Sequence, residues 1–389
     1  MGFSAQWTYR KRVVDEMMKA AIIASSGNTI DLALGDPDLN TDARVIQAAF
    51  DDAERGHTHY APARGDNDLL QAIQETWSQD LGVALNEEEL MVSASGSHAM
   101  WLLLMSILDP EDEVIIFSPY FSPYPEQILL AKGTPVEVST SASNGFTPTA
   151  DALKDAITPK TKAVIVNSPC NPTGKILNKH EIESLLEVCI AHKILYIADD
   201  IYTAFDFEQP FVAAACCDCA KGNVATIRSF SKDFCMSGWR VGYVVAPKDV
   251  ISTMLSINES NVYVAPTISQ RAAYHALELR DEISRSVRET YKERMEYVVS
   301  RIATIPYLTL PSSQGGLYAF IDISKSAETS SSFTYKLLKK YGVSVIAGTA
   351  FGKAGEGFIR MALRENTRVL AKVFDALASD PEWGAHSAL

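Results

Sequence analysis

The residues with the clearest chemical potential are Lys232, in Ser229-Phe230-Ser231-Lys232, and Arg240, which follows shortly after it. A lysine amine condenses with an aldehyde to form a Schiff base. An arginine holds a phosphate group through forked, charge-assisted hydrogen bonds. The pair therefore predicts a site for a phosphorylated aldehyde, which points to pyridoxal phosphate. The alternative interpretation is a surface lysine that lies near serines, and this segment alone does not separate the two.

Three predicted strands, at residues 163–166, 194–198 and 223–228, each end in polar residues. The residues that follow the strands are Asn171; Asp199 and Tyr202; and Ser229 with Lys232. Between the first two strands a helical face is predicted, with a capping-box start at Asn178 and Glu181. Ligands of open parallel sheets bind beyond the carboxyl ends of the strands, so we expect these side chains to meet at one site.

Each of these side chains has a task that pyridoxal chemistry requires. A carboxylate at Asp199 would keep the pyridine nitrogen protonated, which makes the ring a good electron acceptor. Tyr202 and Asn171 could bind the ring oxygen and lower the pKa of the imine on Lys232. The competing interpretation of an acid at a strand end is a helix N-cap. We prefer it for Asp200, and for Asp199 alone both interpretations stay open.

A phosphate cradle is predicted at Ser95-Gly96-Ser97-His98, which lies between a strand at 90–93 and a helix at 99–108. Backbone amides and the helix dipole at such a turn favour an anion. We expect Gly96 and Ser97 to join Ser229, Ser231 and Arg240 around the cofactor, with His98 contributing through its backbone. Phe121, after a strand at 113–117, could stack on the ring, and core packing is its alternative role.

The alternation of strands and helices predicts an α/β fold with a mainly parallel sheet covered by helices on both faces. One long amphipathic helix, with or without a kink, is expected at about 268–304. Strands at 316–321 and 342–346, with a helix at 333–341, predict a smaller α+β domain. We therefore divide the chain into an N-terminal segment that joins the small domain, a large cofactor-binding domain, and a small domain, at 1–45, 46–280 and 281–389.

Composition excludes several classes of function. Among 389 residues, 48 are acidic and 35 basic, and the formal net charge of −13 opposes a nucleic-acid partner. The longest apolar run, at 99–108, is far shorter than the roughly 20 residues that span a bilayer. The first residues, Met1 to Gln6, lack an apolar signal core, so we expect a cytosolic protein. Cys216-Cys217-Asp218-Cys219 lacks the spacing of a zinc site, and no metal is predicted.

In combination, these segments resemble the pyridoxal-phosphate-dependent aminotransferases of fold type I, class I/II. The matching segments, in the order of that family, are Leu34-Gly35-Asp36-Pro37-Asp38, Tyr60 with Gly65, Ser95-Gly96-Ser97, Asn171-Pro172-Thr173-Gly174, Asp199-Asp200-Ile201-Tyr202, Ser229-Phe230-Ser231-Lys232, Gly238-Trp239-Arg240-Val241-Gly242 and Phe358-Ile359-Arg360. The resemblance implies a large domain with a sheet of seven strands. It also implies transfer of an amino group from an L-amino acid to a 2-oxo acid.

The resemblance assigns further roles to individual residues. It implies that Lys232 is the Schiff-base lysine and also moves the substrate's Cα proton. It implies that Arg360 clamps the substrate α-carboxylate, while Gly35 lines the same pocket. Tyr60 matches a tyrosine that reaches the phosphate of the other subunit, which implies a homodimer with shared sites.

The sequence departs from the family pattern at a few positions, one of which bears on the substrate. Asp200 stands where the family usually has glutamate, and Ala347-Gly348 replaces its usual Pro-Gly. No arginine occurs at 256–267, so a dicarboxylate substrate is not supported.

Three other functions remain as alternatives. They are C–S β-elimination and other reactions on the same imine, a serine acyl-enzyme built on the Ser-x-x-Lys pattern at Ser229, and a non-catalytic cofactor-binding protein.

Overall fold

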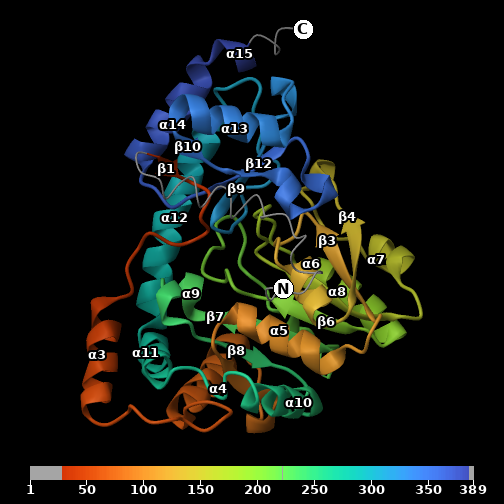
Figure 1. Ribbon diagram of the computed structural model, residues 1–389, viewed down its shortest axis with the longest axis vertical. Helices are drawn as coiled ribbons and strands as arrows, with labels where there is room; N and C mark the ends of the chain where they lie inside the picture. The colour runs from red at the N-terminus through yellow and green to blue at the C-terminus, as the bar shows by residue number, and fades with distance from the viewer. Residues whose placement is uncertain (1–28, 221, 385–389) are drawn as a thin grey trace, which may run out of the picture.

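A seven-stranded sheet lies at the centre of the chain, which the computed structural model describes over residues 29–220 and 222–384 (Figure 1). The strands are β2 (Leu90–Ser93), β3 (Glu113–Ser118), β4 (Thr134–Ser139), β5 (Thr161–Asn167), β6 (Leu195–Asp199), β7 (Val224–Ser229) and β8 (Gly242–Val245). Their order is β2-β8-β7-β6-β5-β3-β4. β8 runs antiparallel to β2 and β7, and the other neighbours are parallel, which confirms the predicted sheet.

Helices cover both faces of this sheet, as β5 illustrates. Ile165 packs in a cluster with residues of α5 and α10, whereas Val164 and Val166 pack with residues of α7 and α8. Alternate side chains of a strand point to opposite faces, so an unbroken apolar run is expected in a strand covered on both sides. The helices nearest the sheet are α5 (Gly96–Ile107), α6 (Tyr124–Leu130), α7 (Ala150–Ala156), α8 (Lys179–His192) and α10 (Lys248–Glu259).

The predicted start of α8 agrees with the structure, whereas α5 begins at Gly96 rather than at the predicted residue 99, because the Ser95 side chain caps the helix there. In α8 the Asn178 side chain accepts a hydrogen bond from the Glu181 amide at 3.0 Å, and Glu181 accepts one from the Asn178 amide at 2.8 Å. This is the predicted capping box. The remaining helices before the chain leaves the sheet are α3 (Ala43–Glu54), α4 (Asn67–Leu81) and the short α9 (Phe230–Asp233).

The prediction of a single long helix at 268–304 is wrong in one respect, because the structure has two helices in this range. These are α11 (Thr267–Glu278) and α12 (Arg280–Ile302), which meet at Leu279. The Arg280 guanidinium donates to the Leu277 carbonyl at 3.4 Å and also binds Asp80. A carbonyl near the end of α11 is thus bonded by a side chain, one of the ways in which helix ends are satisfied. From this point α12 rises toward the C-terminal elements (Figure 1).

Two small sheets form around the upper end of α12. β9 (Tyr318–Asp322), β12 (Phe358–Ala362) and β11 (Ile346–Ala347) are antiparallel in the order β11-β12-β9. β1 (Ile30–Asp31) pairs in parallel with β10 (Val343–Ser344), so the strand predicted at 342–346 is split between β10 and β11. The helices of this part are α13 (Ser330–Tyr341), α14 (Thr367–Ser379) and α15 (Pro381–Gly384).

The division at residues 45 and 280 stays a prediction. The pairing of β1 with β10 is what a segment joined to the C-terminal part would make. Residues 1–28 and 385–389 lie outside the described residues. The prediction of a cytosolic protein, which used Met1 to Gln6, falls in that part of the sequence.

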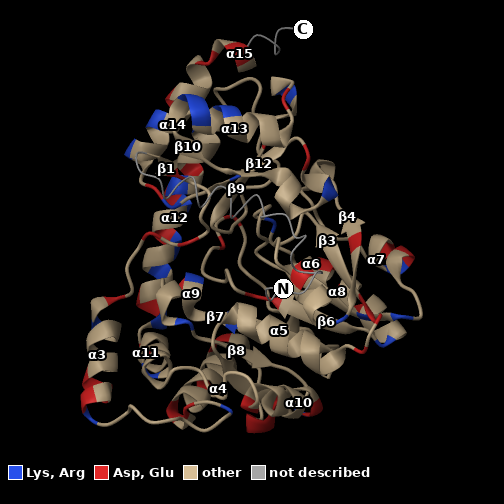
Figure 2. Cartoon of the chain, in the orientation of Figure 1, with Lys and Arg blue, Asp and Glu red and all other residues tan. Residues whose placement is uncertain are grey.

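Acidic and basic residues are interspersed along many elements of the chain in the view of Figure 2. Across the described ranges, no helix combines the length and the apolar character that crossing a membrane requires.

Candidate active site

A pocket with a volume of about 210 Å³ lies at the carboxyl ends of β5, β6 and β7. It is lined by eleven of the residues predicted for the site: Gly35, Gly96, Ser97, Phe121, Asp199, Tyr202, Ser229, Ser231, Lys232, Arg240 and Arg360. Leu34, Ser95, Asn167, Ile201, Ser237 and Tyr318 complete the lining. Most of the predicted side chains therefore lie in one pocket, as expected for residues that follow the strands of a parallel sheet.

Lys232 lies in α9, directly after β7, and its amine points at the N-terminal segment. Nζ donates to the Gly35 carbonyl at 2.5 Å and lies 3.9 Å from the Asp36 carboxylate. Burial lowers the pKa of Lys232 to about 8, an effect that Asp36 opposes and that Arg240 and Arg360 reinforce. A substantial fraction of this amine is therefore neutral near physiological pH, which a nucleophile or proton acceptor requires.

Asp199 ends β6 and is almost fully buried. The Tyr124 hydroxyl donates to Oδ2, while Oδ1 is buried and has no hydrogen-bond partner in the described structure. Burial raises the pKa of Asp199 to about 7, and the bond from Tyr124 opposes this rise. An unpartnered carboxylate oxygen in a pocket wall is costly unless a donor or cation reaches it. This oxygen is therefore suited to a protonated nitrogen.

Tyr202, Asn171 and Arg360 are connected by hydrogen bonds. The Asn171 amide nitrogen donates to the Tyr202 hydroxyl at 3.3 Å, and Arg360 donates to the Asn171 side-chain oxygen at 3.2 Å. Arg360 also donates to the Ala33 carbonyl at 2.5 Å. Asn171 is buried behind the wall of the pocket rather than in its lining. Its contacts nevertheless join the two residues that were predicted to contact cofactor and substrate.

An anion cradle forms where α5 begins. Ser95 is the N-cap of this helix, and Gly242 of β8 packs directly beneath it. A Cβ on Gly242 would lie 2.9 Å from the Gly96 amide nitrogen, so only glycine allows this approach. Ser229 caps α9 in the same way, since its hydroxyl accepts from the Ser231 amide at 3.1 Å. Two helix starts and the guanidinium of Arg240 thus face one pocket.

Besides Asn171, two other predicted cofactor contacts, His98 and Tyr60, lie outside the lining of the pocket. The His98 amide donates to the Ser95 hydroxyl at 3.1 Å, and its ring Nδ1 accepts from the Ala94 amide. Its backbone donor therefore serves the helix cap. Tyr60 is 84 % exposed and makes an edge contact with Tyr263. It lines a neighbouring hollow that shares Arg240 with the pocket.

The prediction that Asp200 caps a helix is wrong. Residues 200–202 continue as irregular chain, and the buried Asp200 carboxylate instead lies 3.9 Å from Arg228. Burial raises the pKa of Asp200 to about 7, which the Arg228 charge opposes. The chain does not enter a helix here, and two residues later Tyr202 lines the pocket.

Sequence reasoning missed Tyr124, Asn167 and Tyr318. The Asn167 amide donates to the Asp199 carbonyl at 2.6 Å, so it fixes the end of β6 against β5. Asn167 is itself the last residue of a strand, and the strand-end rule could have found it. Tyr124 and Tyr318 carry no such signal, since one begins α6 and the other begins β9.

Residues 27–377 match the family described as aminotransferase class I and II. The chain belongs to this family. Members of the family use pyridoxal phosphate, and the chain is an amino-acid aminotransferase of the same fold.

Similar proteins support this assignment at the level of sequence and structure. The chain is 35% identical over 336 residues to an aspartate aminotransferase of Geobacillus stearothermophilus, covering 85% of this chain and 86% of the relative. It is also 35% identical over 332 residues to an arginine–pyruvate transaminase of Pseudomonas aeruginosa, covering 85% and 84%.

Among solved structures, the aspartate aminotransferase of Rhizobium meliloti matches with a TM-score of 0.93 and 30% identity over 97% of this chain and 98% of that one. An aromatic aminotransferase of Pyrococcus horikoshii matches with a TM-score of 0.88 and 32% identity, covering 92% and 97%. The named relatives are transaminases, so transamination is favoured over the elimination alternative.

Proposed function

We propose that this aminotransferase holds pyridoxal phosphate through Lys232 and moves an amino group from an L-amino acid to a 2-oxo acid. The observation that carries this proposal is the convergence of an amine, a buried carboxylate and two guanidinium groups on one pocket, at Lys232, Asp199, Arg240 and Arg360. Each of these groups matches a different part of the cofactor or the substrate.

The pocket residues fit this cofactor in their chemistry. The unpartnered Oδ1 of Asp199 suits the pyridine nitrogen in its protonated form. Gly96 and Ser97 at the start of α5, together with Ser229, Ser231 and Arg240, suit a phosphate group. Phe121 offers an aromatic face for the ring. Tyr202 would bind the ring oxygen, with Asn171 acting through its bond to Tyr202.

Pyridoxal phosphate supplies an aldehyde that condenses with amines and a ring that withdraws electrons from the substrate Cα. The Lys232 amine would hold the cofactor covalently in the absence of substrate. Because burial brings the pKa of Lys232 to about 8, its amine would be suited to accept and return the proton of the substrate Cα.

Arg360 would bind the substrate α-carboxylate through its forked donors. In the described part of the chain, the other basic side chains in the lining are Lys232 and Arg240, which have roles of their own. No lining cation is left for a second carboxylate, and Leu34 and Ile201 add apolar surface. We therefore propose donors with neutral side chains.

We further propose a cytoplasmic homodimer in which Tyr60 contacts the phosphate site of the partner. The support is the exposure of Tyr60 and its place in a hollow of about 730 Å³ that also includes Arg240. A sedimentation velocity measurement tests the dimer directly, and a monomer at all concentrations would contradict it.

The proposed function is tested with the purified holoenzyme and a panel of L-amino acids, one at a time, while the absorbance of the bound cofactor is followed. Transamination converts the cofactor to its amine form in a single half-reaction, and a 2-oxo acid reverses it. Release of pyruvate with ammonia would instead indicate elimination. Borohydride reduction followed by peptide mapping should label Lys232, and a protein with no visible band and no labelled Lys232 would exclude the proposal.

A further inference from the structure

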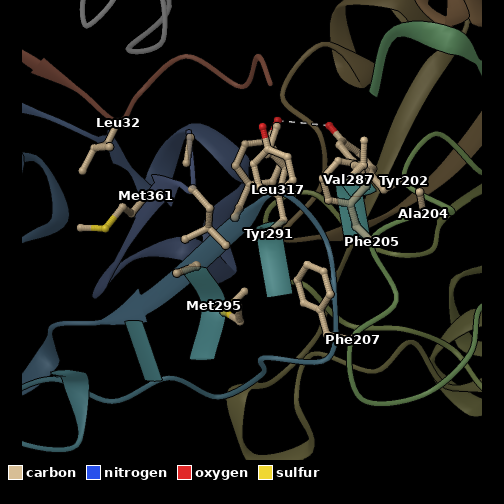
Figure 3. Close-up of a cluster of buried hydrophobic side chains, with 14 of the residues drawn as sticks. Leu32, Tyr202, Ala204, Phe205, Phe207, Val287, Tyr291, Met295, Leu317 and Met361 are labelled. Atoms are coloured by element: carbon tan, nitrogen blue, oxygen red, sulfur yellow. Dashed lines mark hydrogen bonds between the residues drawn. The ribbon is translucent and has the colours of Figure 1, made fainter. Parts of the chain in front are cut away.

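Tyr318, the first residue of β9, is the buried lining residue for which neither the sequence nor the proposed mechanism supplies a role. It is 2% exposed. Its hydroxyl lies 3.1 Å from the Tyr202 hydroxyl, and this is the hydrogen bond drawn at Tyr202 in Figure 3. The Arg360 guanidinium lies over its ring at 4.3 Å from the centroid. One side chain thus contacts both the proposed ring-oxygen ligand and the proposed carboxylate anchor.

These contacts close a cycle of four residues. Tyr318 bonds Tyr202, Tyr202 accepts from Asn171 at 3.3 Å, Asn171 accepts from Arg360 at 3.2 Å, and Arg360 lies on the Tyr318 ring. The four residues come from separate parts of the chain. A change at one member therefore affects the orientation of its neighbours, as in other buried polar networks.

The direction of the hydrogen bonds follows from Arg360. A guanidinium has donors and no acceptor, so the Asn171 atom that faces it must be the oxygen. The Asn171 amide nitrogen therefore faces Tyr202 and donates to it. Burial raises the pKa of Tyr202 well above its usual value, so this phenol keeps its proton at neutral pH. That single proton can go either to Tyr318 or to a group in the pocket.

We propose that Tyr318 is a positioning residue, whose hydroxyl donates to Tyr202 and so directs the Tyr202 proton into the pocket, and whose ring holds Arg360 for the substrate carboxylate. This rests on the proposed function. The hydroxyl of Tyr318 has little freedom to turn away, because Gly35 packs against it. A Cβ at position 35 would lie 2.0 Å from that oxygen.

The first test replaces only the hydroxyl, in Tyr318→Phe. A donor to the ring oxygen stabilises the deprotonated form of the bound cofactor, so weakening Tyr202 as a donor should raise the pKa seen in the pH dependence of the cofactor's visible absorbance. We expect a rise of about half to one unit, the size of one hydrogen bond. An unchanged value, or a fall, would overturn the proposal, since a fall means that Tyr202 had been donating to Tyr318.

A matched control is Tyr307→Phe. Tyr307 is also 2% exposed, and its hydroxyl donates to the Leu377 carbonyl at 2.6 Å, outside the pocket lining. It should lower the melting temperature without moving the absorbance pKa. If both variants move that pKa equally, Tyr318 acts only through general stability.

The second test removes the aromatic face, in Tyr318→Leu, and measures binding of 3-phenylpropionate to the holoenzyme by absorbance titration. This probe has a carboxylate and no amino group. We expect its Kd to rise about threefold to tenfold in Tyr318→Leu, as loss of a cation–π contact would cause, and to stay within about twofold in Tyr318→Phe. Equal effects in both variants would contradict the role of the ring. If the wild-type protein lacked the visible absorbance band of the cofactor, the proposed function itself would be excluded.

Discussion

Tyr124 donates a hydrogen bond to one oxygen of the buried Asp199 carboxylate, and the other oxygen has no partner in the described structure. The hydrogen bond from Tyr124 fixes the orientation of the Asp199 carboxylate in the pocket wall, and one carboxylate oxygen has no hydrogen bond. Such a group stores an unfavourable burial cost that an incoming cation relieves.

The first prediction concerns Asp199→Asn, which keeps the shape of the side chain and removes its charge. We expect cofactor affinity and kcat to fall by about 10²- to 10³-fold, consistent with loss of a buried charge pair. Fluorescence titration of the cofactor-free protein and steady-state kinetics measure the two effects. Asp380→Asn is a suitable control because Asp380 is buried and pairs with Lys340 and Tyr341, outside the pocket. Near-normal cofactor binding in Asp199→Asn would contradict the role of this carboxylate.

The second prediction is a pH dependence. Because the pKa of Lys232 is lowered to about 8, the amine is mostly protonated below that pH and mostly neutral above it. The neutral amine is the form that attacks an aldehyde. The rate at which the cofactor-free protein recaptures pyridoxal phosphate should therefore rise with pH through about 8 and then level off. Stopped-flow absorbance follows this rate, and a midpoint near 10 would show that burial does not tune the amine.

The third prediction concerns Asp36, which lies 3.9 Å from the Lys232 amine and raises the pKa of Lys232 against the effect of burial. Asp36→Asn removes that negative charge, so the midpoint of cofactor recapture should move to lower pH. Asp31→Asn, which affects the ion pair with Arg364, is the matched control and should leave the midpoint in place. A shift to higher pH in Asp36→Asn would be inconsistent with this electrostatic effect.

The fourth prediction is that Arg360→Lys raises KM for amino acids by about 10- to 100-fold, because a lysine cannot form the forked pair with a carboxylate. Arg364→Lys provides the control, since Arg364 binds Asp31 at 2.7 Å and does not line the pocket. Kinetics on a single donor, with the cofactor absorbance checked for both variants, separates substrate binding from cofactor binding. Similar KM values for the two variants would exclude Arg360 as the anchor.

The fifth prediction concerns stability. Oδ2 of Asp200 and Nε of Arg228 are buried, lie 3.9 Å apart, and have no hydrogen-bond partners in the described ranges. Glutamate is one methylene longer, so Asp200→Glu should let the two groups bond and raise the free energy of unfolding by about 1 kcal/mol. Urea unfolding of the cofactor-free protein measures the change. A lower midpoint would mean that the cavity does not accept the longer side chain.

The sequence predicted those features that follow from local rules. Lys232 and Asp199 follow strands of a parallel sheet, and the position of such residues at the sheet edge depends on topology alone. The prediction of a helix cap at Asp200 was wrong because an acid that follows a strand is also common at the start of a helix. Only the three-dimensional structure shows that the chain continues irregularly here. At the break near Leu279, Arg280 bonds Asp80, a contact between residues far apart in sequence that local patterns do not reveal.

Tyr318 could not be assigned for a related reason. Its strand has an ordinary buried pattern, and its partners Tyr202 and Arg360 lie in other segments. A tyrosine in a buried strand predicts core packing, which is also correct here, since Tyr318 belongs to the main hydrophobic cluster. The polar contacts of Tyr318 join segments that are far apart in sequence, so they are identified only in the folded structure.

The pairing of β1 with β10 has a consequence for the order of events during synthesis. Ile30 pairs with Val343, which the ribosome adds roughly 300 residues later. Until then this short strand lacks its partner, and Leu34 and Gly35, which follow it in the pocket lining, lack the anchor that positions them. Contacts this distant in sequence form late because the loop between them must close first. We therefore expect a nascent chain to assemble the sheet of the cofactor site before the wall that meets the substrate.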